Sequence, residues 1–116
     1  MINILSIAIG GALGSILRYG VQKLFNTSFP IGTLSVNIAG CFLIGWLWAI
    51  SLKSLSEQWR LFLMTGFCGG FTTFSAFTLE SIQMMMADRW MIFSLYIIGS
   101  IAGGLLATFL GYKIFS

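Results

Sequence analysis

A run of glycines and hydroxyl residues in the second half of the chain has the composition of an ion site. The run reads Gly66-Phe67-Cys68-Gly69-Gly70-Phe71-Thr72-Thr73-Phe74-Ser75-Ala76-Phe77. Adjacent glycines weaken a helix, and the hydroxyls of Thr72, Thr73 and Ser75 can offer the backbone competing hydrogen bonds. Breaks of this kind in membrane transporters expose carbonyl oxygens that coordinate cations. The run predicts a broken helix and a candidate ion site; the alternative is a tight helix crossing whose hydroxyls bond to their own turn.

Two other apolar stretches carry polar side chains at helical spacing. Asn37 follows Thr33 by four residues, so both point from one helical face. The Asn37 amide can donate to an anion in a pore or, equally, to a neighbouring helix, which is the commoner use of such a group. Tyr96 and Ser100 repeat the spacing and continue to Gly104. They form a narrow hydroxyl stripe that can hydrate a moving ion.

Two phenylalanines, Phe74 and Phe77, share a helical face directly after the glycine run. Such rings ordinarily contact the core or lipid, but their edges carry positive potential. A small anion that accepts strong hydrogen bonds can pass between ring edges and side-chain donors without meeting a full charge that would trap it. The pair therefore suits an anion pathway.

Arg18 and Glu80 are the ionisable residues inside apolar stretches, where charged groups are costly and commonly functional. By position along the chain, both lie toward the same side of a membrane. They can pair with each other or line a vestibule, and Arg18 can also extend its head group to the interface.

The composition of the whole chain is that of an integral membrane protein. Of 116 residues, 58% are hydrophobic and 8% are charged, against about 25% charged residues in soluble domains. Crossing the hydrocarbon core takes about 20 apolar residues. Four segments are long enough, namely 2–22, 31–52, 60–86 and 90–112. We expect an all-α fold with four transmembrane helices, the third broken near its middle, as one transmembrane domain spanning residues 1–116.

The same composition argues against several classes of function. The chain has no histidine, and its acids are Glu57, Glu80 and Asp88, which leaves little for acid and base catalysis. Cys41 and Cys68 lie in apolar stretches, where they read as small packing residues rather than as a disulfide framework or a paired metal motif. The basic residues are scattered singly. We expect neither an enzyme nor a nucleic-acid-binding protein.

The basic residues also give the chain little preference for one orientation. Four crossings put Lys53, Arg60 and Lys113 on the side of the termini, and Lys23, Arg89 and arguably Arg18 on the other. Because the Lys and Arg bias between loops sets the orientation of a membrane protein, this near balance permits insertion both ways and antiparallel pairing of two copies. A single, weakly biased topology is the alternative.

Small residues recur at spacing four inside the expected helices, a pattern that lets helix backbones approach closely. The pairs and stripe are Gly10 with Gly14, Gly66 with Gly70, and Gly99, Gly103, Ala107 and Gly111. The pattern predicts a compact bundle.

Taken together, the GFCGGFTTFSAF run, Asn37 in a glycine-rich second helix, and a GxxGSxxRY motif ending in Arg18-Tyr19 resemble the Fluc (CrcB) family of fluoride channels. The resemblance covers essentially the whole chain. It implies a dual-topology antiparallel homodimer in the inner or plasma membrane of the cell, which lets toxic fluoride leave the cytoplasm passively. It also implies two pores and a structural sodium ion at the subunit interface.

The resemblance carries roles to individual residues. Gly69 and Thr72 would bind sodium through their backbone carbonyls, and Arg18 would help form the vestibule. The fluoride path would be lined by Asn37, Phe74 and Phe77, with Thr33, Ser75, Thr78, Tyr96 and Ser100 as nearby polar groups. The chain departs from the family pattern at Ala76 and Gly104, each of which removes a hydroxyl. Glu80 matches an acidic position, but no role is assigned to it.

Two other functions are compatible with a small four-helix membrane protein. A dual-topology multidrug exporter would need a membrane carboxylate, usually in its first helix, and this first helix has none. A non-transporting assembly subunit would need only helix packing, which leaves the polar residues at mid-membrane depth unexplained.

Overall fold

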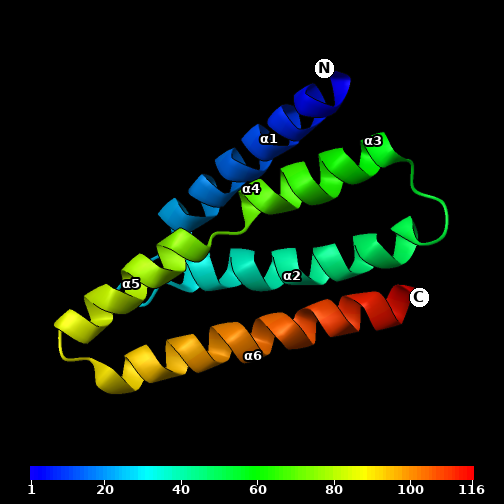
Figure 1. Ribbon diagram of the computed structural model, residues 1–116. Coiled ribbons are helices and arrows are strands. Elements are labelled where there is room, and N and C mark those ends of the chain that lie inside the picture. Colours follow the sequence, from blue (N-terminus) through cyan, green and yellow to red (C-terminus); the bar gives the residue numbers. More distant parts are fainter.

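The computed structural model describes residues 1–116 and is entirely helical apart from loops (Figure 1). The elements are α1 (Ile2–Phe25), α2 (Ile31–Ser51), α3 (Glu57–Arg60), the π-helical η1 (Leu61–Cys68), α4 (Gly69–Phe71), α5 (Phe74–Met86) and α6 (Trp90–Phe115). Four stretches are long and apolar enough to cross a membrane, the third being Glu57–Met86. The prediction of an all-α protein with four membrane-spanning helices is confirmed.

The helix ends differ by a few residues from those expected. The first and last helices continue to Phe25 and Phe115, beyond the expected ends at 22 and 112. Each carries a lysine in its last turn, Lys23 or Lys113, where a positive charge interacts favourably with the helix dipole. The third begins at Glu57 rather than 60 because Ser56 caps it, accepting a hydrogen bond from the Trp59 N–H at 3.4 Å.

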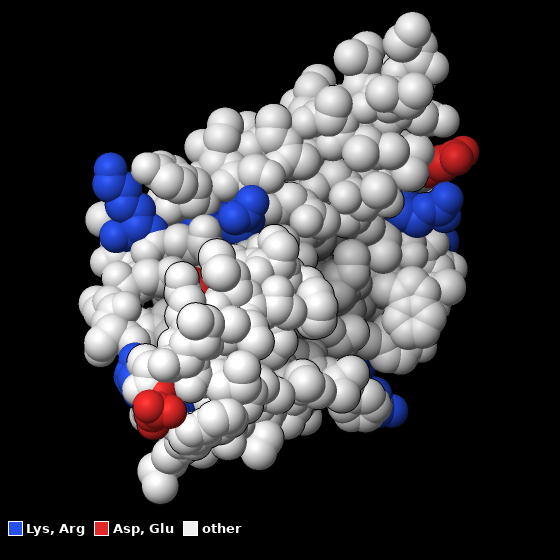
Figure 2. Space-filling view, turned by 60° about the vertical axis from the view of Figure 1, so that its left-hand side comes forward, with Lys and Arg blue, Asp and Glu red and all other residues white.

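The two termini lie at the same end of the bundle (Figure 1). Charged groups gather toward two opposite sides of the molecule, with uncharged surface between them (Figure 2). Large apolar side chains are exposed along all four spans, for example Ile16, Trp48, Leu79 and Leu105. A surface of this kind is stable in lipid and not in water, so the chain is a multi-pass membrane protein.

Close backbone contacts join α1 to the third span. A Cβ on Gly10 or Gly14 would clash with backbone atoms of Phe62 or Phe67, and one on Gly66 or Gly70 would clash with α1. The two glycine pairs found in the sequence therefore pack against each other. Small residues allow this approach, which maximises van der Waals contact where lipid removes the hydrophobic driving force.

Helices α2 and α6 form a second close pair. A Cβ on Gly111 would meet the Phe42 carbonyl, and one on Gly45 would meet the Thr108 carbonyl. A Cβ on Gly99 would meet nothing within 4 Å. The small-residue stripe of α6 therefore contacts α2 only from Gly103 onward. The third span packs closely on α1 and also contacts α2.

The third span is broken near its middle, as predicted, and the break lies just after the glycine pair. Gly69 has helical dihedrals of φ −61° and ψ −39°. Thr72 and Thr73 are extended, with ψ of 156° and 116°, and a helix resumes at Phe74. The break is thus made by the threonines.

Candidate functional site

The side chains of the two threonines explain why the helix stops and restarts where it does. The Thr72 hydroxyl and N–H both donate to the Cys68 carbonyl, at 2.9 and 3.0 Å, and so complete the end of the first segment. The Thr73 hydroxyl accepts the Ala76 N–H at 3.1 Å and caps α5. Threonine is a favoured N-cap because its oxygen satisfies an otherwise free amide.

Asn37 of α2 holds the backbone of the break. Its Nδ2 donates to the Thr73 carbonyl at 3.0 Å, and its Oδ1 accepts the Thr73 N–H at 2.7 Å. Of the two uses left open for this amide, the bond to a neighbouring helix is the one observed. An amide NH2 has two hydrogens, so one remains for another acceptor.

The break leaves several carbonyls, those of Gly69 and Thr72 among them, without the amide that a continuous helix would supply. The donor expected for Gly69 is the Thr73 N–H, which bonds to Asn37 instead. The donor expected for Thr72 is the Ala76 N–H, which bonds to the Thr73 hydroxyl. Both carbonyl-bearing residues line a cavity of about 350 Å³. We call it the α2–η1 cavity; it is bordered by Asn37, Gly40, Cys41, Ile44, Met64, Cys68, Gly69, Thr72, Thr73 and Phe74. Carbonyl oxygens freed in this way fit a hard cation.

Arg18 lies against the other side of the break. Its Nε donates to the Gly70 carbonyl at 3.0 Å, and its Nη1 donates to Gln22 Oε1 at 3.3 Å. The Ser15 hydroxyl donates to the same carbonyl at 3.5 Å. A positive charge therefore lies beside the unwound backbone. The assignment of Arg18 to a vestibule stays a prediction.

Glu80 of α5 is the centre of a half-buried polar cluster. Its Oε1 accepts the Tyr96 hydroxyl at 2.8 Å, and its Oε2 accepts the Thr33 hydroxyl at 2.8 Å. The Asn26 amide also donates to Oε2, at 3.2 Å. Thr33 and Tyr96 are 0% and 1% exposed. The Glu80 carboxylate thus accepts hydrogen bonds from neutral donors. Such bonds are stronger when the acceptor is charged.

Arg18 and Glu80 form no ion pair; side chains link them through hydrogen bonds. Gln22 accepts from Arg18 and donates to the Thr33 hydroxyl at 3.0 Å, which in turn donates to Glu80. This chain of donors and acceptors runs from the break to Tyr96 across the bundle. Buried networks of this kind are stable only when every member is satisfied.

Aromatic rings run beside the polar cluster. The Phe77 ring lies between Phe74 and Tyr96, with centroid distances of 5.7 and 5.2 Å. Phe29 meets Tyr96 edge to face at 5.5 Å. Phe77 is buried, but Phe74 is 77% exposed and points out of the subunit. The two phenylalanines are neighbours, yet one faces the core and the other faces outward.

The remaining hydroxyls divide into two groups. The Ser100 hydroxyl is buried and has no hydrogen-bond partner, and the Ser75 hydroxyl lies 3.3 Å from that of Thr73. Thr78, in contrast, is exposed and donates to the Ser75 carbonyl in its own turn at 2.9 Å. The structure brings Thr78 to neither the break nor the carboxylate cluster.

Sequence reasoning missed Gln22 and Asn26 and gave Glu80 no role. The signal was present at the end of the first helix, where Arg18, Gln22 and the C-cap residue Asn26 recur at intervals of four. Residues at this spacing share a helical face, and here that face meets Thr33 and Glu80.

Comparison with known proteins identifies the family. The model of the CrcB-like protein family (Camphor Resistance, CrcB) matches residues 5–112. The chain belongs to the CrcB family. The matched residues of this CrcB chain include the break, the carboxylate cluster and every candidate site residue predicted from the sequence.

Several curated proteins are similar to this CrcB chain over nearly their whole length. A protein of Chlorobium luteolum is 46% identical over 115 residues, covering 95% of this chain and 89% of the relative. One of Chloroflexus aurantiacus is 44% identical, with 96% and 93% covered, and one of Leptospira interrogans is 45% identical, with 94% and 91% covered. All three are named fluoride-specific ion channel FluC.

Proposed function

We propose that this CrcB chain forms a fluoride channel that lets fluoride leave the cell passively and so limits its toxicity. The observation that carries the proposal is the similarity, at about 45% identity and over nearly the full length, to relatives named fluoride-specific ion channel. The chain moves an ion and is not an enzyme.

The geometry of the subunit supports a path for a small anion. Such an anion can meet the free hydrogen of the Asn37 amide, the edges of Phe74 and Phe77, and the Ser100 hydroxyl. The donors are neutral, and the Ser100 hydroxyl has no other partner. A compact anion gains most from such donors because it accepts strong hydrogen bonds, whereas chloride is larger and accepts them less strongly. Ser75 extends the set of donors. The Thr33 and Tyr96 hydroxyls donate to Glu80 and the Thr78 hydroxyl to the Ser75 carbonyl, so each of these three contributes only after a change of rotamer.

We further propose that two subunits pair antiparallel in the inner or plasma membrane. Phe74 is 77% exposed beside the break, and Gly69 faces open space. A second subunit would cover both and complete the wall of the path. The near balance of Lys and Arg between the two ends supports insertion in both orientations.

The carbonyls of Gly69 and Thr72 would hold a sodium ion at this interface. Their own helical donors are diverted to Asn37 and Thr73, which supports binding of a cation in place of an amide. When bound, sodium would fix the two breaks relative to each other by charge attraction to carbonyl oxygens.

The proposal is tested by anion efflux from liposomes. Purified protein is reconstituted into vesicles loaded with fluoride or chloride, and a potassium ionophore is added to remove the limiting membrane potential. Ion-selective electrodes should record rapid fluoride efflux and negligible chloride efflux. Folded, inserted protein that releases no fluoride would contradict the proposal and favour the exporter or the assembly subunit.

A further inference from the structure

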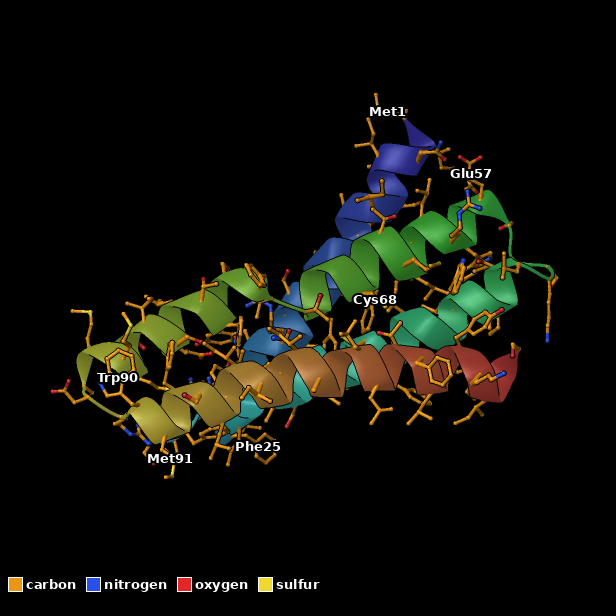
Figure 3. All side chains as sticks on the ribbon, turned by 60° about the horizontal axis from the view of Figure 1, so that its bottom comes forward. Met1, Phe25, Glu57, Cys68, Trp90 and Met91 are labelled. Atoms are coloured by element: carbon orange, nitrogen blue, oxygen red, sulfur yellow. The ribbon has the colours of Figure 1, made fainter.

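Three sulfur-containing side chains line the α2–η1 cavity, and the proposed function uses none of them. Cys41 belongs to α2, and Met64 and Cys68 belong to η1. Figure 3 places Cys68 about midway between Glu57 at one end of the third span and Trp90 at the other end of the bundle. The sulfur residues therefore border one open hollow in the membrane-spanning part of the subunit.

The local geometry leaves these sulfurs available. Met64 and Cys68 are four residues apart on one helix and so share a face, and both border the cavity across from Cys41. Cys68 is only 3% exposed. Both cysteines are free thiols. The small residue Gly104 adjoins Cys41, because a Cβ there would lie 3.3 Å from the Cys41 sulfur. The Cys41 sulfur thus lies beside α6, and metal binding would require the thiol to rotate from Gly104 toward the cavity.

We propose that Cys41, Cys68 and Met64 bind a thiophilic metal ion of the Cu(I) class in the α2–η1 cavity. Thiolate and thioether ligands select soft metals such as Cu(I). A structural zinc site takes about four nitrogen or sulfur ligands, and the chain has no histidine and two cysteines. An iron–sulfur cluster needs about four cysteines. Each cysteine that ligates the metal gives its proton to solvent.

Such an ion would tie α2 to η1 beside the residues of the break. Asn37 and Thr72 border the same cavity, so metal occupancy would restrict the Asn37 amide and its surroundings. Inhibition of fluoride efflux by the metal is the expected consequence. This consequence rests on the proposed function, whereas metal binding itself does not.

Competition for Cu(I) tests the binding. Purified full-length protein is mixed anaerobically with a coloured Cu(I)–bicinchoninate complex, and loss of colour reports transfer of the metal. The wild type should take up Cu(I), and C41S, C68S and M64L should each bind at least about tenfold more weakly. The matched control is M91L, since Met91 is 76% exposed and lies at one end of the bundle (Figure 3); it should bind as the wild type does.

Folding is checked by monodisperse elution of each variant, and C41A and C68A replace any serine variant that does not elute as the wild type. No uptake of Cu(I) by the wild type, or wild-type affinity in a folded variant lacking both thiols, would overturn the inference. Fluoride efflux is then measured with and without Cu(I). Binding by a protein that conducts no fluoride in the absence of metal would support the metal site and contradict the proposed function.

Discussion

The side-chain amide of Asn37 pairs with the backbone of Thr73 through two hydrogen bonds, of 3.0 and 2.7 Å. This pairing supplies both a donor and an acceptor to a peptide that no longer belongs to a helix. Irregular backbone at membrane depth persists only where protein or water satisfies it. Asn37 therefore stabilises the break and, with its second amide hydrogen, can still face an anion.

The variant Asn37→Ala is expected to lose both stability and fluoride efflux. The backbone N–H and C=O of Thr73 both lose their hydrogen-bond partner, at a cost of about 1–3 kcal/mol for each buried unsatisfied group. Thermal unfolding in detergent measures the first effect and liposome efflux the second. Asn3→Ala is the matched control because Asn3 is exposed near the N-terminus. Unchanged efflux from folded Asn37→Ala would remove this residue from the proposed path.

The Thr33 and Tyr96 hydroxyls both donate to Glu80. Their contributions to the free energy of unfolding are expected to be coupled. Tyr96→Phe removes the 2.8 Å bond to Oε1, and Thr33→Val removes the 2.8 Å bond to Oε2. Hydrogen bonds to a charged group contribute about 1.5–3 kcal/mol. Each single variant should lower the free energy of unfolding by this order, and the double variant should depart from additivity because both bonds end on one carboxylate.

Titration with sodium dodecyl sulfate measures these free energies for a membrane protein. Tyr19→Phe is the control for the loss of a hydroxyl, since Tyr19 is 63% exposed. Additive effects of the two substitutions would mean that Thr33 and Tyr96 do not share Glu80 as an acceptor in the folded protein.

The sequence was sufficient to predict the helices and the existence of the break, because both depend on local composition. The sequence did not indicate which residues of the glycine and hydroxyl run would leave the helix. Adjacent glycines lower helix propensity, yet Gly69 stays helical because the third span packs closely against α1 through Gly66 and Gly70. The chain leaves the helical conformation at Thr72, where threonine hydroxyls take the place of backbone hydrogen-bond donors and acceptors.

The polar cluster was harder to predict because it depends on tertiary contacts. Glu80 meets Asn26 and Thr33 only after three helices have packed together. Spacing within one helix indicates which residues share a face, but not which face of another helix it meets. For the same reason, the amide of Asn37 could not be assigned to the backbone of Thr73 from the sequence.

The glycines between α1 and the third span should not tolerate alanine. In Gly10→Ala the new methyl group would clash with the Phe62 carbonyl and the Phe67 amide, and overpacking of this kind costs about 1–3 kcal/mol. Gly20→Ala is the matched control in the same helix, because a Cβ there meets nothing within 4 Å. The detergent titration should show a loss for the first and no loss for the second. Equal stability of both variants would mean that α1 packs differently in the membrane.

The variant Phe77→Ile is expected to fold and to lose fluoride efflux. Isoleucine keeps an apolar group at a buried position but removes the positive ring edge, which lies between Phe74 and Tyr96. Phe109→Ile is the control, since Phe109 is 56% exposed on α6. Liposome efflux and elution volume are measured for both. Wild-type efflux from Phe77→Ile would argue against a role for ring edges in the path.

The variant Gly69→Ala distinguishes an effect on the folding of the subunit from an effect on its proposed dimerisation around sodium. A Cβ on Gly69 meets nothing within 4 Å in the subunit, and alanine favours helix by about 1 kcal/mol over glycine, so the subunit should remain folded. If a second subunit and sodium approach this surface, the methyl group should weaken dimerisation and reduce efflux, as should replacement of sodium by a large organic cation. Gly99→Ala, which also points into open space, is the control. If Gly69→Ala cross-links and releases fluoride as the wild type does, and if activity is full after thorough removal of sodium, the interface lies elsewhere on the subunit.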